Sequence, residues 1–213
     1  MKTAPVTDTQ LATLIGAERR ELAAVLGDLP EQSWNAPTLC AGWRVREVVA
    51  HMTMLYRYST ARFLTELARS GGRFDRMADR LARRDGAGPV AGLVSVMAEN
   101  AVSVPKTPGV GYEGALIHDV IHGLDVSVPL GLDRRVPEET LRIVLAGVTK
   151  PKSLKHFGAE LDGVELRAED LDWSFGSGTP VSGAAQDLAL VICGRALPSG
   201  RLRGAASSRF TAS

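Results

Sequence analysis

The stretch 114–131, GALIHDVIHGLDVSVPLG, combines apolar residues at helical spacing with two histidines four residues apart, His118 and His122. Residues four apart on a helix lie one turn apart on the same face, so we expect both imidazoles to point the same way. Asp125 follows three residues after His122 and continues this polar stripe. The pattern predicts a helix from about residue 112 to residue 126 that ends before the Pro-Leu-Gly segment.

Two imidazoles from one helix need a third ligand to form a transition-metal site that keeps one position open. The chain has two other histidines, His51 and His156. His51 falls within a predicted long helix, whereas His156 lies in a basic segment outside the stripe. We therefore predict that His51, His118 and His122 bind one divalent metal ion, Zn²⁺ or another.

The sequence also allows a second interpretation of these histidines, as ordinary surface or core residues of helices. HExxH metalloproteases place glutamate directly after the first histidine, whereas Asp119 follows His118 here. On a helix Asp119 points a quarter of a turn or more away from His118, which makes it a weaker candidate for the site.

Two further polar candidates follow His51 in the sequence, Tyr58 after seven residues and Arg62 after eleven. On one continuous helix both would lie on the histidine's side, where they would line the same pocket. Tyr58 would then contact a bound cofactor, and Arg62 would hold an anionic substrate. Aromatic packing for Tyr58 and solvent exposure for Arg62 are the alternative interpretations.

Composition and charge limit the possible partners. The chain has 213 residues, enough for one ordinary domain or a main domain with a small appendage. Its formal net charge of +1 argues against nucleic acid or an anionic membrane as the main partner, because both require a basic face. The start, MKTAPVTDTQ, lacks the apolar core of a signal peptide, and no apolar run is long enough to span a membrane. We expect a soluble cytoplasmic protein that binds small molecules, and the sequence leaves a homodimer open.

The two cysteines are Cys40 and Cys193. In a cytoplasmic protein both are expected to be free thiols that pack as small apolar residues. Cys40 also lies just before a predicted helix N-terminus, where a thiolate is stabilised, so it remains a candidate for redox chemistry.

Apolar periodicity predicts a helical region up to residue 150 and a small α+β region from 151 to 213. The predicted helices are residues 8–27, 44–69, 74–86, from 90 to just before Pro105, 112–126 and 137–149. Long helices with short connections are typical of an antiparallel bundle. After residue 151 we expect short strands between residues 160 and 175, a last helix capped by Ser182, and a weakly fixed tail from 198 that contains one short strand.

Four segments resemble a known family. They are LPEQSWNAPTLCAGWRVREVVAHM (29–52), RFDRMADRLARRD (73–85), ALIHDVIHGLDVSVPLG (115–131) and LRAEDLDWSFGSGTPVSGAAQDLALVICGR (166–195). In combination they are similar to the mycothiol-dependent maleylpyruvate isomerase family of actinobacteria. The resemblance implies a DinB-like antiparallel four-helix bundle followed by a small α+β C-terminal region.

The resemblance also implies a site and a cofactor. The family's metal histidine after Gly-Trp falls on His51, and its closing histidine falls on His122. His118 takes the place where the isomerases often have glutamate, which makes a three-histidine set. The implied co-substrate is mycothiol, bound to the metal as a thiolate that adds to an electrophile, as an isomerase or a transferase. Asp125 would then contact the thiol or hydrogen-bond to a metal ligand. A solvated or capping carboxylate near the helix end is the alternative interpretation.

Two other functions remain open from the residues alone. The same site would support hydrolysis of a small ester or amide by a metal-bound hydroxide, without any thiol. Alternatively the metal would serve as a structural clip in a protein that is not an enzyme. Turnover that depends on a thiol distinguishes the thiol-dependent enzyme from the hydrolase. The effect of chelation on the fold tests whether the metal is structural.

Overall fold

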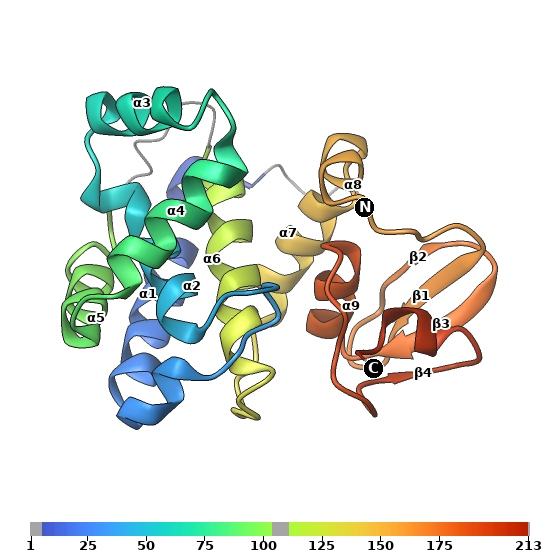
Figure 1. The fold of residues 1–213 in the computed structure, drawn as a ribbon. Coiled ribbons are helices and arrows are strands. Elements are labelled where there is room, and N and C mark those ends of the chain that lie inside the picture. Colours follow the sequence, from blue (N-terminus) through green and yellow to red (C-terminus); the bar gives the residue numbers. More distant parts are fainter. Residues whose placement is uncertain (1–5, 104–110, 213) are drawn as a thin grey trace. The chain divides into compact units, whose positions relative to one another are not determined.

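The computed structural model describes residues 6–103 and 111–212, with the side chain of Leu55 left out (Figure 1). The chain divides into two compact units, unit 1 (Met1–Gly123) and unit 2 (Leu124–Ser213). The division falls within helix α6 (Tyr112–Ser127), whereas the sequence places a boundary after residue 150. Among the described residues, every helix is too short or too polar to cross a membrane.

Unit 1 is helical. The described elements up to the division are α1 (Asp8–Gly27), the short 3-10 helix η1 (Glu31–Asn35), α2 (Val45–Arg57), α3 (Thr60–Arg69), α4 (Phe74–Gly86), α5 (Val90–Glu99) and the greater part of α6. Helix α1 begins as predicted, because Thr7 Oγ1 accepts a hydrogen bond from the Gln10 amide and Gln10 Oε1 accepts one from the Thr7 amide. Helix α5 ends several residues before its predicted end next to Pro105, which lies outside the described residues.

The predicted single helix over residues 44–69 is wrong, because the chain breaks it after Arg57. Tyr58 has an extended backbone at the end of α2, and Ser59 then caps the separate helix α3 by accepting a hydrogen bond from the Arg62 amide at 3.2 Å. A serine that bonds to the next turn favours a new helix start over continuation of the old one. Tyr58 and Arg62 therefore do not share a helix with His51.

Helix α2 is the centre of unit 1. It packs against α4, α5 and η1, and its apolar side chains Val48, Val49 and Met52 are completely buried. Helix α4 comes close to the backbone of α2 at Gly86, where a side-chain carbon would lie 3.1 Å from the Arg46 carbonyl oxygen. This glycine lets the two helices lie in direct backbone contact.

Unit 2 combines helices with one sheet. Its described elements are α7 (Glu138–Val148), α8 (Pro151–Phe157), β1 (Val164–Ala168), β2 (Ser174–Gly176), β3 (Thr179–Gly183), α9 (Ala185–Ile192), β4 (Leu202–Arg203) and the 3-10 helix η2 (Ser207–Phe210). The strand order is β2-β1-β3-β4, with β1 and β3 parallel and the outer pairs antiparallel. Helix α9 is buried against α7 and the two parallel strands. The expected fold class, a helical bundle followed by a small α+β region, is confirmed.

Three details of unit 2 differ from the sequence prediction. Helix α8 was not expected. Ser182 does not cap α9 but lies in β3, where its hydroxyl donates to Glu169 Oε1. The C-terminal tail is fixed, because Leu197 donates its amide to the Phe210 carbonyl and accepts from the Ala212 amide, both at 2.8 Å.

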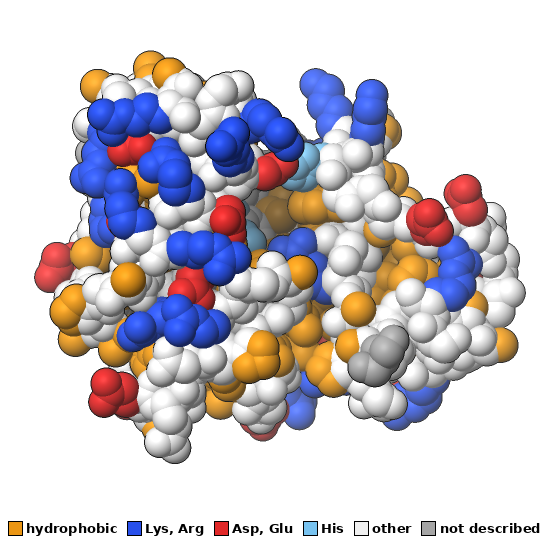
Figure 2. Space-filling model, in the orientation of Figure 1, with side chains coloured by type: hydrophobic (Ala, Val, Ile, Leu, Met, Phe, Trp, Pro, Cys, Tyr) orange, Lys and Arg blue, Asp and Glu red, His pale blue; other side chains and the backbone are white. Residues whose placement is uncertain are grey.

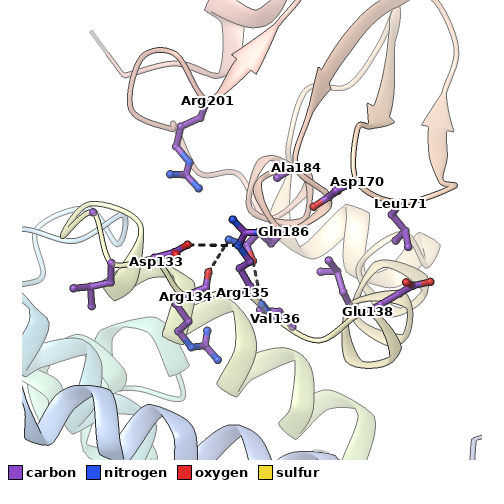
Figure 3. Close-up of a pocket in the computed structure, with 13 residues that line it drawn as sticks. Asp133, Arg134, Arg135, Val136, Glu138, Asp170, Leu171, Ala184, Gln186 and Arg201 are labelled. Atoms are coloured by element: carbon purple, nitrogen blue, oxygen red, sulfur yellow. Dashed lines mark hydrogen bonds and ion pairs between the residues drawn. The ribbon is translucent and has the colours of Figure 1, made fainter.

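A cavity of about 590 Å³ lies between the N-terminal ends of α7 and α9 in unit 2 (Figure 3). Gln186 closes one side of it: its Oε1 accepts a hydrogen bond from the Val136 amide and its Nε2 donates to the Arg134 carbonyl, both at 3.2 Å. Arg201 on the opposite side donates to Asp187 Oδ1 at 2.8 Å. The lining mixes both signs of charge and contains no histidine or cysteine among the described residues.

The contact between α2 and α4 predicts opposite effects for two glycine substitutions. Gly86→Ala must displace the Arg46 carbonyl, so we expect a loss of about 1–3 kcal/mol in the free energy of unfolding. Gly92→Ala in α5 meets no atom within 4 Å and should raise it by about 0.5–1 kcal/mol through helix propensity. Chemical denaturation of both variants measures the difference. Equal effects would mean that backbone contact at Gly86 does not matter.

Candidate metal centre

The three histidines predicted to bind metal come together in unit 1. His51 from α2 and His118 from α6 place their Nε2 atoms 3.2 Å apart. His122, one turn further along α6, completes the group, and one ligand nitrogen from each residue lies within 4.8 Å of the others. The ring centres form a nearly equal triangle with sides of 4.7–5.1 Å. His51 is buried, while the other two are partly exposed.

The turn before α2 fixes the surroundings of His51. The Trp43 amide donates to the Cys40 carbonyl at 3.0 Å, and Gly42 adopts a φ of 76°, as required at the third position of a type II turn. The Trp43 ring lies 5.1 Å from the His51 ring. Its Nε1 donates to Asp79 Oδ1 of α4 at 2.8 Å. The Cys-x-Gly-Trp segment is therefore a structural device that holds an indole ring beside the histidines.

Asp119 is a residue of the site that the sequence analysis ranked too low. Its Oδ1 lies 3.1 Å from His118 Nδ1, and its Oδ2 accepts a hydrogen bond from Arg19 Nε of α1 at 2.6 Å. The side chains of Arg19 and Asp119 are completely buried. A carboxylate on Nδ1 fixes the imidazole with Nε2 free to act as a ligand.

Cys40 lies beside His122, with its Sγ 3.6 Å from His122 Nδ1. The cysteine is half-buried and lines the same cavity as His51 and His122. The other cysteine, Cys193, is buried in unit 2, and burial raises the pKa of its thiol to about 12. The expectation that both thiols are free is met, and Cys40 is close to the histidines of unit 1.

The remaining site candidates lie elsewhere. Tyr58 packs with Met54, Met77 and Leu81, and burial, followed by its hydrogen bond to Asp85, raises the pKa of its phenol. The Arg62 guanidinium stacks over the Tyr58 ring at 4.1 Å. In the described structure neither lines the cavity beside the histidines.

Asp125 belongs to unit 2. It is fully buried and binds the Arg195 guanidinium through both carboxylate oxygens, at 3.0 and 2.9 Å. Such a bidentate pair satisfies a buried carboxylate with charge-assisted hydrogen bonds. Its role as a contact for the thiol stays a prediction.

The residues present fit a divalent transition metal. Two nitrogens on one tetrahedral zinc ion, each at about 2.0–2.1 Å, lie about 3.3–3.4 Å apart. The observed separation of 3.2 Å between His51 Nε2 and His118 Nε2 is close to this value. Neutral imidazole suits zinc, copper, iron and nickel alike, so the donor set indicates a class of metal and not one element.

Part of the chain resembles a known family. Residues 15–108 match the family model described as the mycothiol maleylpyruvate isomerase N-terminal domain. Over this segment the chain is similar to that family. The family resemblance seen in the sequence is thereby confirmed. The matched segment includes His51 and ends before His118 and His122.

Two solved structures share the fold. One is a histidine-to-alanine variant of the mycothiol-dependent maleylpyruvate isomerase, at 15% identity and a TM-score of 0.62. The other is the mycothiol-dependent maleylpyruvate isomerase, at 18% identity and a TM-score of 0.54. Each comparison covers 95% of this chain and 94% of the other. No curated protein sequence matches the chain.

The buried pair of Arg19 and Asp119 predicts a large loss of stability when one partner is removed. Arg19→Met leaves a buried carboxylate without its cation, so we expect the free energy of unfolding to fall by about 3–5 kcal/mol. The control is Arg142→Met, which breaks the exposed pair with Glu138 and should cost at most about 1 kcal/mol. Urea denaturation measures both. A cost for Arg19→Met no larger than the control would contradict this account of the site.

Proposed function

We propose that the chain is a metal-dependent enzyme that activates a low-molecular-weight thiol, mycothiol, for addition to a small electrophile. The outcome is isomerisation when the thiol adds to a double bond and leaves again, or transfer when it displaces a leaving group. The observation that supports this most is the convergence of His51, His118 and His122. The match of residues 15–108 to the mycothiol maleylpyruvate isomerase N-terminal domain supports the choice of thiol.

Within this proposal the three histidines hold the metal and supply no charge of their own. A divalent metal bound by neutral imidazoles keeps its full positive charge and stabilises a bound thiol as thiolate. Asp119 orients His118, and Arg19 holds that carboxylate in place. Trp43, held by Asp79, limits access of water to His51 from one side. The protein therefore needs no cysteine of its own as nucleophile.

The decisive variant is His51→Ala. Removing one of three ligands should reduce bound zinc from stoichiometric to near zero and abolish thiol transfer, because His118 and His122 alone leave the site one ligand short. The control is His156→Ala, which changes an exposed histidine of α8 and should leave both unchanged. Elemental analysis and thiol-transfer assays of the purified variants measure the effect. Full zinc content and activity in His51→Ala would refute the assignment.

The same preparation separates a thiol-dependent enzyme from a metal hydrolase. We expect turnover of an electrophile to require added mycothiol and to saturate with its concentration. Equal rates of ester or amide hydrolysis with and without thiol would favour a metal-bound hydroxide instead. A protein that binds zinc, is stabilised by it and turns over nothing would point to a structural metal.

A further inference from the structure

The cavity beside the histidines has an acidic and aromatic lining. It measures about 350 Å³, and His51 and His122 form part of its wall. Helix α4 contributes the carboxylates of Asp75 and Asp79, while Trp43 and Phe74 contribute rings. Among the described residues that line it there is no lysine or arginine.

The arginines of this region lie on the outer surface. Figure 2 shows them gathered over α3 and α4 with acidic side chains between them. Several are already paired: Arg80 and Arg84 with Glu66, and Arg57 with Asp85. The charges of Arg80 and Arg84 of α4 are therefore compensated by Glu66, while Arg83 pairs with Asp79 at the cavity.

The two carboxylates at the cavity differ in their partners. Asp79 accepts hydrogen bonds from Trp43 Nε1 at 2.8 Å and from Arg83 Nε at 2.9 Å, so its charge is compensated. Asp75 is exposed and forms no ion pair with any side chain in the described part of unit 1. One uncompensated negative charge remains at the rim, next to the half-exposed ring of Phe74.

We propose that this rim selects cationic or uncharged substrates and disfavours anionic ones, and that Asp75 is the residue responsible. The inference rests on the proposed function. A carboxylate attracts an ammonium group and repels another carboxylate. The faces of Trp43 and Phe74 favour the same choice, because an aromatic ring attracts a cation. The substrate class is thus a small organic cation or neutral molecule, unlike maleylpyruvate, whose carboxylates carry negative charge.

Three small thiols that differ mainly in charge test this selection. Cysteamine is cationic, 2-mercaptoethanol is neutral and mercaptoacetate is anionic. Their dissociation constants for the Co²⁺-loaded full chain follow from titration of the cobalt–thiolate absorption band. The measured quantity is the ratio of the constants for mercaptoacetate and cysteamine, compared among the original chain, Asp75→Asn and Asp75→Lys. Comparing variants cancels the intrinsic difference between the thiols.

Glu99→Lys is the matched control, because Glu99 is an exposed carboxylate at the end of α5 that does not line the cavity. We expect Asp75→Asn to lower the ratio about three- to tenfold and Asp75→Lys to lower it further, as a charge at about 7 Å in water would. Glu99→Lys should leave it unchanged. The difference should shrink at about 1 M salt, where charges are screened within about 3 Å.

The outcomes separate the two levels of the argument. A cobalt–thiolate band with the same ratio in the original chain and in Asp75→Lys overturns the selection by charge and leaves the proposed function standing. A shift of equal size in Glu99→Lys also overturns it, because the effect would then come from net charge alone. No cobalt–thiolate band with any of the thiols overturns the proposed function and this inference with it.

Discussion

The candidate site depends on one buried ion pair, between Arg19 of α1 and Asp119 of α6. Taking two charges out of water costs several kcal/mol per ion unless each is paired and hydrogen-bonded. Arg19 offsets part of this cost by donating from Nη1 to the carbonyls of Asn100 and Ser103, although its buried Nη2 has no hydrogen-bond partner. Asp119 offsets part of it by contacting His118 Nδ1. The orientation of a proposed metal ligand is thus set by a residue one hundred positions earlier in the chain. Stability of unit 1 and geometry of the site share the same interaction.

The spacing of the histidines was enough to predict that they group together. The long-range pair between Arg19 and Asp119 could not be predicted from the sequence. His118 and His122 share a face because of helical periodicity, and His51 was selected because few histidines exist. The contact of Asp119 with His118 was not predicted, because a helical projection places the two residues on different faces. The imidazole of His118 nevertheless turns its Nδ1 toward that carboxylate. No sequence pattern shows that Arg19 of α1 pairs with Asp119. The partner becomes visible only when the helices are packed.

The prediction failed where short polar side chains decide between continuing and ending an element. Ser59 caps α3, so the helix that carries His51, α2, ends at Arg57. Tyr58 and Arg62 therefore do not lie on the helix face of His51. In unit 2 the tail is held by backbone bonds between Leu197 and residues near the C-terminus. Such hydrogen bonds join segments that lack apolar periodicity, so the sequence predicts a weakly fixed C-terminal tail. The α+β class itself was accessible, because turn glycines and alternating residues mark the strands.

Helix α4 supplies residues to the rim of the cavity but none to the histidine group, which bears on how the substrate preference could evolve. It contributes no histidine to the metal group, yet it supplies the rim through Phe74 and Asp75. Both side chains are solvent-exposed, so replacing them removes little packing energy. Under the proposed function, substrate preference can therefore drift by exchange of rim residues while the proposed metal ligands on α2 and α6 stay constant. A lineage built on this scaffold could explore many acceptors without passing through an unfolded or metal-free ancestor.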